Sequence, residues 1–450
     1  MRVRRATILA AAAFGALAAS AQASNRSFEA ESMVVDRPGA VVADSRASGG
    51  RAVELAPGGS ARLAVTTAAP AYWLSLRATG SNCFGASTID VYVDGALRYS
   101  GAVPSSGYGL VEAWLPSIRR GAHTVEAALH DGGGLVLGCR PSARIDRVTV
   151  HAPFADDSFR NRPLRRDARI ASSSRRLVAS LRRQALVSPG KVWVNTSDWS
   201  VPLYIVPHDQ PPAVIESPTW EVEKQLRGAP LPPNARPADP PDGDHELSLY
   251  QPATDTLWDL HYLRRVSGGP RPRWVAAWGG RMRHVSESPG YFTNARGRMT
   301  FGASASRLTL FGGLQTIEEL EAGRIDHAVD LVLPNVAQGR FVWPAQDSDD
   351  EGHAIGPDPV PEGTRFRLPA SLDVDALGLP PYTRMLAKAI QRYGAVVRDR
   401  GGVVSFKAED PRPRGTDPYS AIFGGQYPDQ DHLFARFPWR KLQVVAPQRK

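Results

Sequence analysis

The sequence is poor in cysteine, in lysine and in long apolar runs, and these shortages exclude several classes of protein. Two cysteines in 450 residues are too few for a disulfide-dense scaffold or a cysteine-ligated metal cluster. No internal run reaches the roughly 18 apolar residues that a transmembrane helix needs. The motifs of a P-loop, a dinucleotide-binding fold, a serine nucleophile elbow and a zinc-protease helix are also missing. We therefore expect no membrane span in the mature chain and no catalytic cofactor.

The N-terminus has the pattern of an export signal. Three arginines within residues 2–5 precede an apolar stretch, Ala6–Ala19, and Ala21-Gln22-Ala23 supplies the small residues of a cleavage site. This pattern predicts a secretory signal peptide over residues 1–23 and a secreted, extracellular protein. An N-terminal anchor helix, the alternative, would need a longer apolar span.

The two cysteines fit an oxidising compartment. An even pair in an exported chain predicts one disulfide, here between Cys83 and Cys139. In the chain-entropy treatment, closing a loop of this size stabilises the fold by about 4 kcal/mol.

Positive charge is concentrated in one segment. The chain has 54 Lys and Arg against 45 Asp and Glu. Between Arg160 and Arg183 the arginines face a single acid, Asp167. Because the surplus is local, we expect no nucleic-acid partner. The stripe is either a solvated Arg-rich linker, placed at residues 153–171, or a surface that attracts an anionic polysaccharide or the cell envelope.

Glycine and proline are abundant, at 41 and 38 residues, while long helical patterns are few. Short alternating stretches such as Ile89–Val93 are separated by turn signals such as Asp94-Gly95, which is typical of β-hairpins. We predict an all-β chain with two β-sandwich, jelly-roll-like domains. The first covers residues 24–152, and the larger second, residues 172–450, also contains a few short helices.

Short motifs recur along the whole first domain: Phe28–Glu31, Tyr72–Ala78, Ile89–Gly95, Gly121–Val125 and Ile145–Val148. In these stretches the chain resembles calcium-containing carbohydrate-binding modules, the front half family 35 and the back half also families 36 and 60. The resemblance implies a structural calcium site made by Glu29, Glu31 and Asp146, since calcium prefers carboxylate and carbonyl oxygens. The alternative is an ion-paired surface patch with Arg51 and Arg144.

The same resemblance implies that the first domain binds a polysaccharide or a cell-envelope glycan. A sugar site needs an exposed aromatic face and a few polar groups. The candidates on the variable loops are Tyr108, Trp114, Asn82 and His130. Families 36 and 60 carry an Asn-Asp pair where this chain has His130-Asp131, a departure from their ligand-calcium site.

The second domain resembles, over Gly302–Leu333, Phe341–Ala345, Pro361–Leu368 and Gln391–Asp399, a widespread group of secreted proteins that are often of unknown function. That resemblance supplies no catalytic residue. Local patterns predict helices over 175–186, after the capping box Thr316–Glu319, and over 383–393, followed by a hairpin over 395–406.

The segment His245–Leu263 reads as two strands. If Tyr250 pairs with Leu257, the apolar side chains share one face with His245, so the pattern itself selects this register. These apolar side chains are Leu247, Leu249, Trp258, Leu260 and Tyr262. The opposite face then carries Glu246, Ser248, Asp259 and His261.

We interpret that polar face as a glycan-binding groove, with Asp259 and Glu246 as the carboxylate pair of a glycoside hydrolase and His261 and His245 as positioning or proton-transfer groups. This interpretation rests partly on analogy, because binding modules usually accompany glycan-active domains. The alternatives are a polysaccharide lyase acting on an acidic glycan and a non-catalytic glycan-binding or adhesion protein. The polar face could equally be an ordinary solvent face.

The acidic stretch Asp347–Asp358 has the acid spacing of a calcium loop. Its proline-rich flanks are not helices, so an EF-hand is excluded. A calcium-binding surface loop and a solvated acidic loop both remain open.

Overall fold

The computed structural model describes residues 25–81, 85–130, 139–186, 191–266, 273–293, 301–349 and 356–447. The predicted signal peptide, Asn82 and Cys83 lie outside these residues. Secretion and the pairing of Cys83 with Cys139 therefore stay predictions. In the part of the chain that the structure describes, no helix is long and apolar enough to cross a bilayer.

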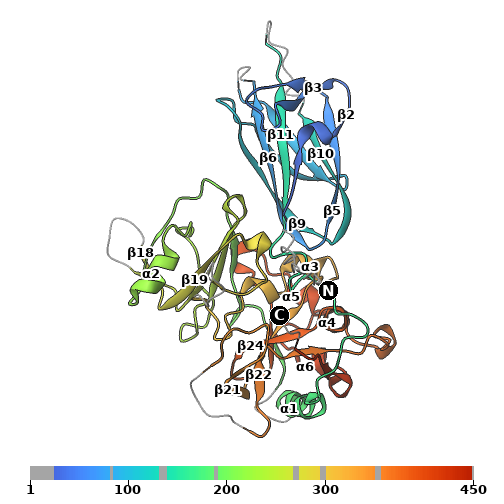
Figure 1. Ribbon diagram of the computed structural model, residues 1–450, viewed down its shortest axis with the longest axis vertical. Coiled ribbons are helices and arrows are strands. Elements are labelled where there is room, and N and C mark those ends of the chain that lie inside the picture. The colour runs from blue at the N-terminus through green and yellow to red at the C-terminus, as the bar shows by residue number, and fades with distance from the viewer. Residues whose placement is uncertain are drawn as a thin grey trace, which may run out of the picture.

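The first domain consists of two antiparallel sheets packed face to face (Figure 1). One sheet has the order β3 (Gly39–Ala43), β4 (Arg51–Leu55), β11 (Ala143–His151), β6 (Ala71–Gly80), β9 (Gly109–Ile118), with β1 (Arg26–Glu29) on β11. The other has the order β2 (Val34–Val35), β5 (Ser60–Thr67), β10 (Gly121–Leu129), β7 (Thr88–Val93), β8 (Ala96–Ala102). Their inward side chains, such as Leu76 and Val125, form one apolar core. This is the predicted β-sandwich.

The hairpin signal in this domain is confirmed. β7 and β8 pair with Val93 opposite Ala96, so Asp94 and Gly95 alone form the turn. Both turn residues have positive φ, 50° and 78°, as the favoured two-residue hairpin turns require.

Where the structure describes it, the second domain is built mostly from strands, in four sheets, with a few helices. The largest sheet has the order β12 (Trp193–Asn195), β25 (Ser405–Lys407), β20 (Val329–Leu333), β24 (Ala395–Arg400), β23 (Arg365–Arg367), β26 (Gln443–Val444). The others are β13 (Leu203–Ile205), β15 (Leu247–Gln251), β16 (Thr256–His261), β19 (Trp278–Arg283); β14 (Val214–Glu216), β18 (Arg273–Val275), β17 (Arg264–Val266); and β21 (Val336–Phe341), β22 (Val360–Glu362). The predicted all-β class with few helices is confirmed.

The α-helices are α1 (Ser174–Leu186), α2 (Trp220–Leu226), α3 (Ile317–Glu321), α4 (Pro381–Arg392), α5 (Tyr419–Ile422) and α6 (Asp431–Phe434). The three predicted helices correspond to α1, α3 and α4. Leu181 of α1 and Leu386 of α4 are buried in the same core as Leu331 of β20 and Val397 of β24. The apolar stripes that predicted α1 and α4 therefore face the largest sheet.

The hairpin predicted over 395–406 is wrong in its pairing. β24 and β25 both form, but β20 lies between them, parallel to β24 and antiparallel to β25. A buried strand from far away in the sequence outcompetes the local pairing, and a turn signal alone cannot reveal it.

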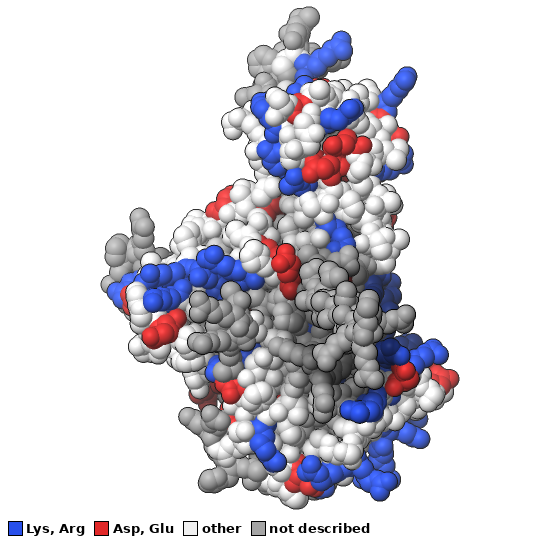
Figure 2. Space-filling view, in the orientation of Figure 1, with Lys and Arg blue, Asp and Glu red and all other residues white. Residues whose placement is uncertain are grey.

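The Arg-rich segment is not simply solvated. Arg160 is fully buried, and its Nη1 donates to Asp330 Oδ1 over 2.7 Å. On α1, by contrast, Arg176 and Arg183 are exposed and pair with Asp358. Figure 2 shows basic side chains gathered on the lower right, over α1, and on the left, over α2 and β18. The expectation of one continuous solvated stripe is therefore corrected at Arg160.

Candidate functional site

The hairpin β15–β16 forms in the predicted register. Tyr250 lies opposite Leu257 and Ser248 opposite Asp259. Leu249 and Leu260 are buried in the apolar core on one side of this sheet. The apolar pattern of the segment was therefore sufficient to fix both the pairing and the inward face.

Asp259, however, does not lie in an open groove. It is fully buried, accepts a hydrogen bond from Ser248 Oγ over 2.6 Å, and accepts another from the backbone N–H of Leu310 over 2.7 Å. Burial raises the pKa of Asp259 to about 7 despite these donors. The polar face is covered by the segment that contains Leu310, so the prediction of Asp259 as a substrate-facing carboxylate is corrected.

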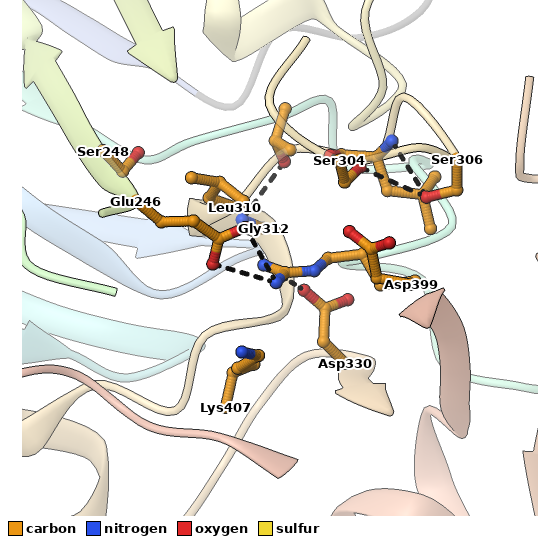
Figure 3. A network of polar contacts seen from close by, with 12 residues as sticks. Glu246, Ser248, Ser304, Ser306, Leu310, Gly312, Asp330, Asp399 and Lys407 are labelled. Carbon is orange, nitrogen blue, oxygen red and sulfur yellow. Dashed lines mark hydrogen bonds and ion pairs between the residues drawn. The ribbon is translucent and has the colours of Figure 1, made fainter. Parts of the chain in front are cut away.

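Glu246 lies at one end of a row of buried charged side chains (Figure 3). Arg398 Nη2 lies 3.2 Å from Glu246 Oε2, and Arg398 Nη1 lies 3.7 Å from Asp330 Oδ2. Asp330 in turn accepts from Arg160. We call Arg160, Asp330, Arg398 and Glu246 the buried ion chain. Burial alone would raise the pKa of Glu246, but the charges of Arg398 and Lys407 outweigh it, so the pKa lies below its ordinary value.

Glu246 lines a cleft of about 850 Å³, which lies between β16, β19, β24 and the loop around residue 347. The charged and aromatic residues that line the cleft are Asp244, Glu246, His261, Tyr262, Trp278, Arg307, Asp347, Asp349, Asp399 and Arg400. The structure thus brings Glu246 and His261 to one cavity, as predicted. Tyr262, expected on the apolar face, is 47% exposed and also lines the cleft, because the strand ends at His261 and Tyr262 has a φ of 50°.

The two histidines differ in their surroundings. His261 lies against Tyr262, with 4.3 Å between ring centroids, and its buried Nδ1 has no hydrogen-bond partner among the described residues. His245 does not line the cleft, because its ring nitrogens lie 3.1 Å from Ala238 O and 2.9 Å from Pro241 O. The predicted role of His245 at the site is therefore corrected, and His245 ties its own loop together.

A second carboxylate, Asp399, faces the same cleft and was missed from the sequence. Burial, together with the negative charges of Asp349 and Glu246, raises the pKa of Asp399 to about 7 against the effect of Arg398. The hairpin expected over 395–406 would place Asp399 in its turn. The sequence signal that could have indicated Asp399 is its position directly after the run Ala395–Arg398, which is buried.

Asp349, Glu362 and Asp399 form a compact acidic group. One carboxylate oxygen of each lies within 4.8 Å of those of the others, close enough to hold a metal ion, and three carboxylates suit a hard cation such as calcium. Glu362 is fully buried, and burial with the negative charge of Asp399 raises its pKa to about 9. Such a group either retains protons or binds a cation.

The predicted calcium loop is only partly described, since residues 350–355 lie outside the described part of the chain. Of its ends, Asp347 pairs with Arg307 at 3.2 Å and Asp358 pairs with arginines of α1. The structure therefore draws Asp349, but not Asp358, to the acidic group.

Glu29 and Asp146 of the first domain meet at Ser48, and Glu31 lies with Glu29 beside the next residue, Gly49. Ser48 Oγ donates to Glu29 Oε2 over 2.7 Å and to Asp146 Oδ1 over 2.9 Å. Asp146 also pairs with Arg77, and Glu29 pairs with Arg147 at 2.9 Å. Only Glu31 keeps a buried oxygen without a partner among the described residues. The residues are thus brought together as predicted, with arginines in contact, although not Arg51 or Arg144; calcium binding there stays a prediction.

The predicted sugar-binding residues of the first domain do not converge. Tyr108 donates to Asp44 over 3.0 Å and lies under Arg77, while His130 pairs with Asp90 at 3.1 Å. Trp114 is covered by Arg414 of the second domain, whose guanidinium carbon lies 4.0 Å from the ring centroid. Trp114 therefore belongs to the contact between the domains, which corrects its prediction as a sugar platform.

Comparisons with known proteins concern the fold. No protein-family model and no curated protein matches the chain. Similar solved structures include a family 35 carbohydrate-binding module from Clostridium thermocellum, at 16% identity and a TM-score of 0.25, over 28% of this chain and 98% of that one. A family 36 module in complex with calcium and xylotriose matches at 18% identity and a TM-score of 0.22, over 28% and 99%.

An exo-β-1,3-galactanase from Phanerochaete chrysosporium matches at 21% identity and a TM-score of 0.24, over 29% of this chain. This chain spans about 30% of the length of that enzyme. The structural neighbours thus include carbohydrate-binding modules and part of a glycoside hydrolase.

Proposed function

We propose that this is a secreted glycoside hydrolase whose second domain cleaves a polysaccharide in the cleft and whose first domain binds the same polymer. The observation that carries the proposal is a pair of carboxylates, Glu246 and Asp399, that face one cavity with opposite pKa shifts. Divergent pKa values in one site are how a protein keeps one carboxyl group as an acid and another as an anion.

The roles follow from the environments. Asp399 retains its proton up to about pH 7 and protonates the glycosidic oxygen as the carbon–oxygen bond breaks. Glu246, held as an anion by Arg398, either attacks the anomeric carbon or removes a proton from the attacking water. If Glu246 attacks, water then hydrolyses the bond between the sugar and Glu246, and Asp399 takes up the proton of that water. If Glu246 acts as the base, it takes the proton of the attacking water, and solvent exchange returns a proton to Asp399 and removes one from Glu246.

The test is hydrolysis of soluble neutral and acidic polysaccharides, read as new reducing ends, by wild type and by Glu246→Gln and Asp399→Asn. We expect each variant to lose roughly 100-fold or more of kcat, the usual contribution of an acid or base. Asp259→Asn is the matched control, because Asp259 has a similar raised pKa but does not line the cleft. Full activity of Asp399→Asn would contradict the assignment.

The pH profile is a second test of the same pair. Because Asp399 must be protonated, kcat/KM falls as pH rises through about 7 in the wild type. The profile should be measured with and without a chelator, since a cation on the acidic group would remove this alkaline limb. A profile without the limb in chelator-treated wild type would count against Asp399 as the acid.

A polysaccharide lyase is the second candidate. Arg307 and Arg400 line the same cleft and suit the carboxylate of a uronate. A base would remove the proton on the carbon next to that carboxylate, and the glycosidic oxygen would leave from the following carbon as the double bond forms. Reducing ends accompanied by ultraviolet absorbance from unsaturated uronates would favour this reading. Binding of one polymer without either product would favour the adhesion alternative.

A further inference from the structure

The cleft continues past Glu246 into two further hollows. A hollow of about 370 Å³ shares Glu246 and Asp399 with the cleft and reaches Asn195 and Trp199. A third, of about 420 Å³, shares Asn195 and Trp199 with the second and extends to Trp193. We call these three adjoining hollows the groove, and the carboxylate pair lines the first two of them.

Two large aromatic side chains stand exposed along this extension. Trp193 is 40% and Trp199 is 41% exposed. On β12 the buried Val194 points into the core, so Trp193 and Asn195 share the outward face next to the groove. Exposed tryptophans in a groove offer apolar faces on which sugar rings stack, with the indole N–H left for a hydroxyl group.

Trp199 is also held in an unfavourable backbone conformation. Its φ is 57°, in the left-handed region that bulky side chains rarely adopt. Its N–H donates to Asp239 O over 2.6 Å, its carbonyl accepts from Lys407 Nζ, and the next residue, Ser200, is fully buried. Neighbouring residues thus hold the strained backbone and keep the ring exposed, a combination that clusters at ligand sites.

We infer that Trp199 and Trp193 are successive sugar-stacking subsites for a glycan chain that runs through the groove across the carboxylate pair. The inference rests on the proposed function and deepens it, because a groove that continues on the Trp199 side of Glu246 takes internal stretches of a polymer. The substrate class is therefore a long polysaccharide cut at internal bonds.

The test compares Trp199→Ala and Trp193→Ala with Trp220→Ala, all made in the Glu246→Gln background so that the polymer is not cut. Trp220 is the matched control, since it is 51% exposed on α2 and lies under Arg227, outside these hollows. Binding is measured by affinity electrophoresis in soluble xylan, a β-1,3-glucan and polygalacturonate. We expect roughly ten-fold weaker binding to one polymer for the two groove variants and no change for the control.

Trp199→Gly separates binding from folding. Glycine adopts a φ of 57° freely, so this variant should bind as weakly as Trp199→Ala without a lower melting temperature. Loss of both, or binding equal to that of Trp220→Ala, would overturn the inference.

The two proposals fail differently. If the wild type cuts no polymer while the tryptophan variants still lose binding, the hydrolase fails and the groove stands. If the wild type cuts a polymer with unchanged KM in Trp199→Ala, the hydrolase stands and the subsites fail. In active enzyme, the subsites also predict that early products are long fragments rather than single sugars.

Discussion

The buried acids of this protein show how one residue type takes different roles. Glu246 is kept ionised by Arg398, whereas Asp259, on the same sheet face, is surrounded by a hydroxyl group and a backbone N–H. For Glu246 the charges of Arg398 and Lys407 outweigh burial and lower the pKa, whereas for Asp259 the hydrogen bonds and the charge of Arg398 do not outweigh it. Solvent access then decides which of the two can meet a substrate.

Asp259 gives a prediction about stability and pH. Its folded-state pKa of about 7 exceeds the unfolded value of 3.8, so the unfolded chain loses the proton first. The contribution of this group is present below about pH 4 and is lost as pH rises through 7. Asp259→Asn keeps an acceptor for Leu310. Its free energy of unfolding should depend less on pH than that of the wild type, and its stability relative to the wild type should be higher at pH 8 than at pH 5. Urea unfolding at both pH values checks this prediction. An equal change in the free energy of unfolding between the two pH values, in variant and wild type, would refute it.

At the scale of residues, the sequence correctly predicted that Glu246 and His261 lie on one face, but Asp259, the predicted second carboxylate, is buried and does not line the cleft. Alternation along a strand defines faces, and it selected Glu246, Ser248, Asp259 and His261 together. What covers a face depends on distant segments, here Leu310, which leaves Asp259 enclosed. Asp399 reaches the cleft only through the pairing of β24 with β20, and no local pattern reports that pairing.

At the scale of elements, short helices depend on their ends. α3 is only five residues long, and its capping box was predicted from the sequence. Thr316 accepts from the backbone N–H of Glu319, whose side chain reaches back to Thr316. Helices this short have little stability of their own, so the cap and tertiary contacts hold them.

Thr316→Ala should lower the free energy of unfolding by about 1 kcal/mol, the usual cost of a lost N-cap. Thr316→Ser is the control, because it retains the hydroxyl oxygen. Denaturant unfolding of the three proteins gives the comparison. An alanine variant as stable as the serine variant would mean that the cap contributes nothing to the fold.

Strands were predicted more reliably than their partners. β15 and β16 are neighbours in the sequence, and their apolar pattern fixed the register. β24 and β25 are also neighbours, but β20 inserts between them. In addition, β12 runs parallel to β25 and β13 parallel to β15, pairings between distant segments that local turn signals do not specify.

At the scale of the whole molecule, the two domains share a packed contact. Tyr72 packs edge-on against Phe311 with 5.5 Å between ring centroids, and Trp114 lies under Arg414. His208 pairs with Glu112 at 2.5 Å across the same contact. Of these contacts, that of Tyr72 with Phe311 links the β-sandwich to the segment that covers Asp259.

The contact predicts a single calorimetric transition for the wild type. Trp114→Ala should lower that transition by about 2–4 °C for each kcal/mol lost, or split it, because the cation–π contact with Arg414 disappears. Polysaccharide binding by the first domain should persist in this variant, and Trp220→Ala should leave the calorimetric trace unchanged. Two separate transitions in the wild type would refute the coupling.

The buried ion chain has a mechanical consequence. Arg160 belongs to the segment that joins the domains. Arg160 pairs with Asp330, Asp330 with Arg398, and Arg398 with Glu246. If the first domain is bound to an insoluble polymer and the cleft binds another part of it, tension along the connecting segment acts on Arg160. The load then passes through fully buried charges, which resist separation, to Glu246. The protein would thus behave as two rigidly joined domains rather than as two domains connected by a flexible linker.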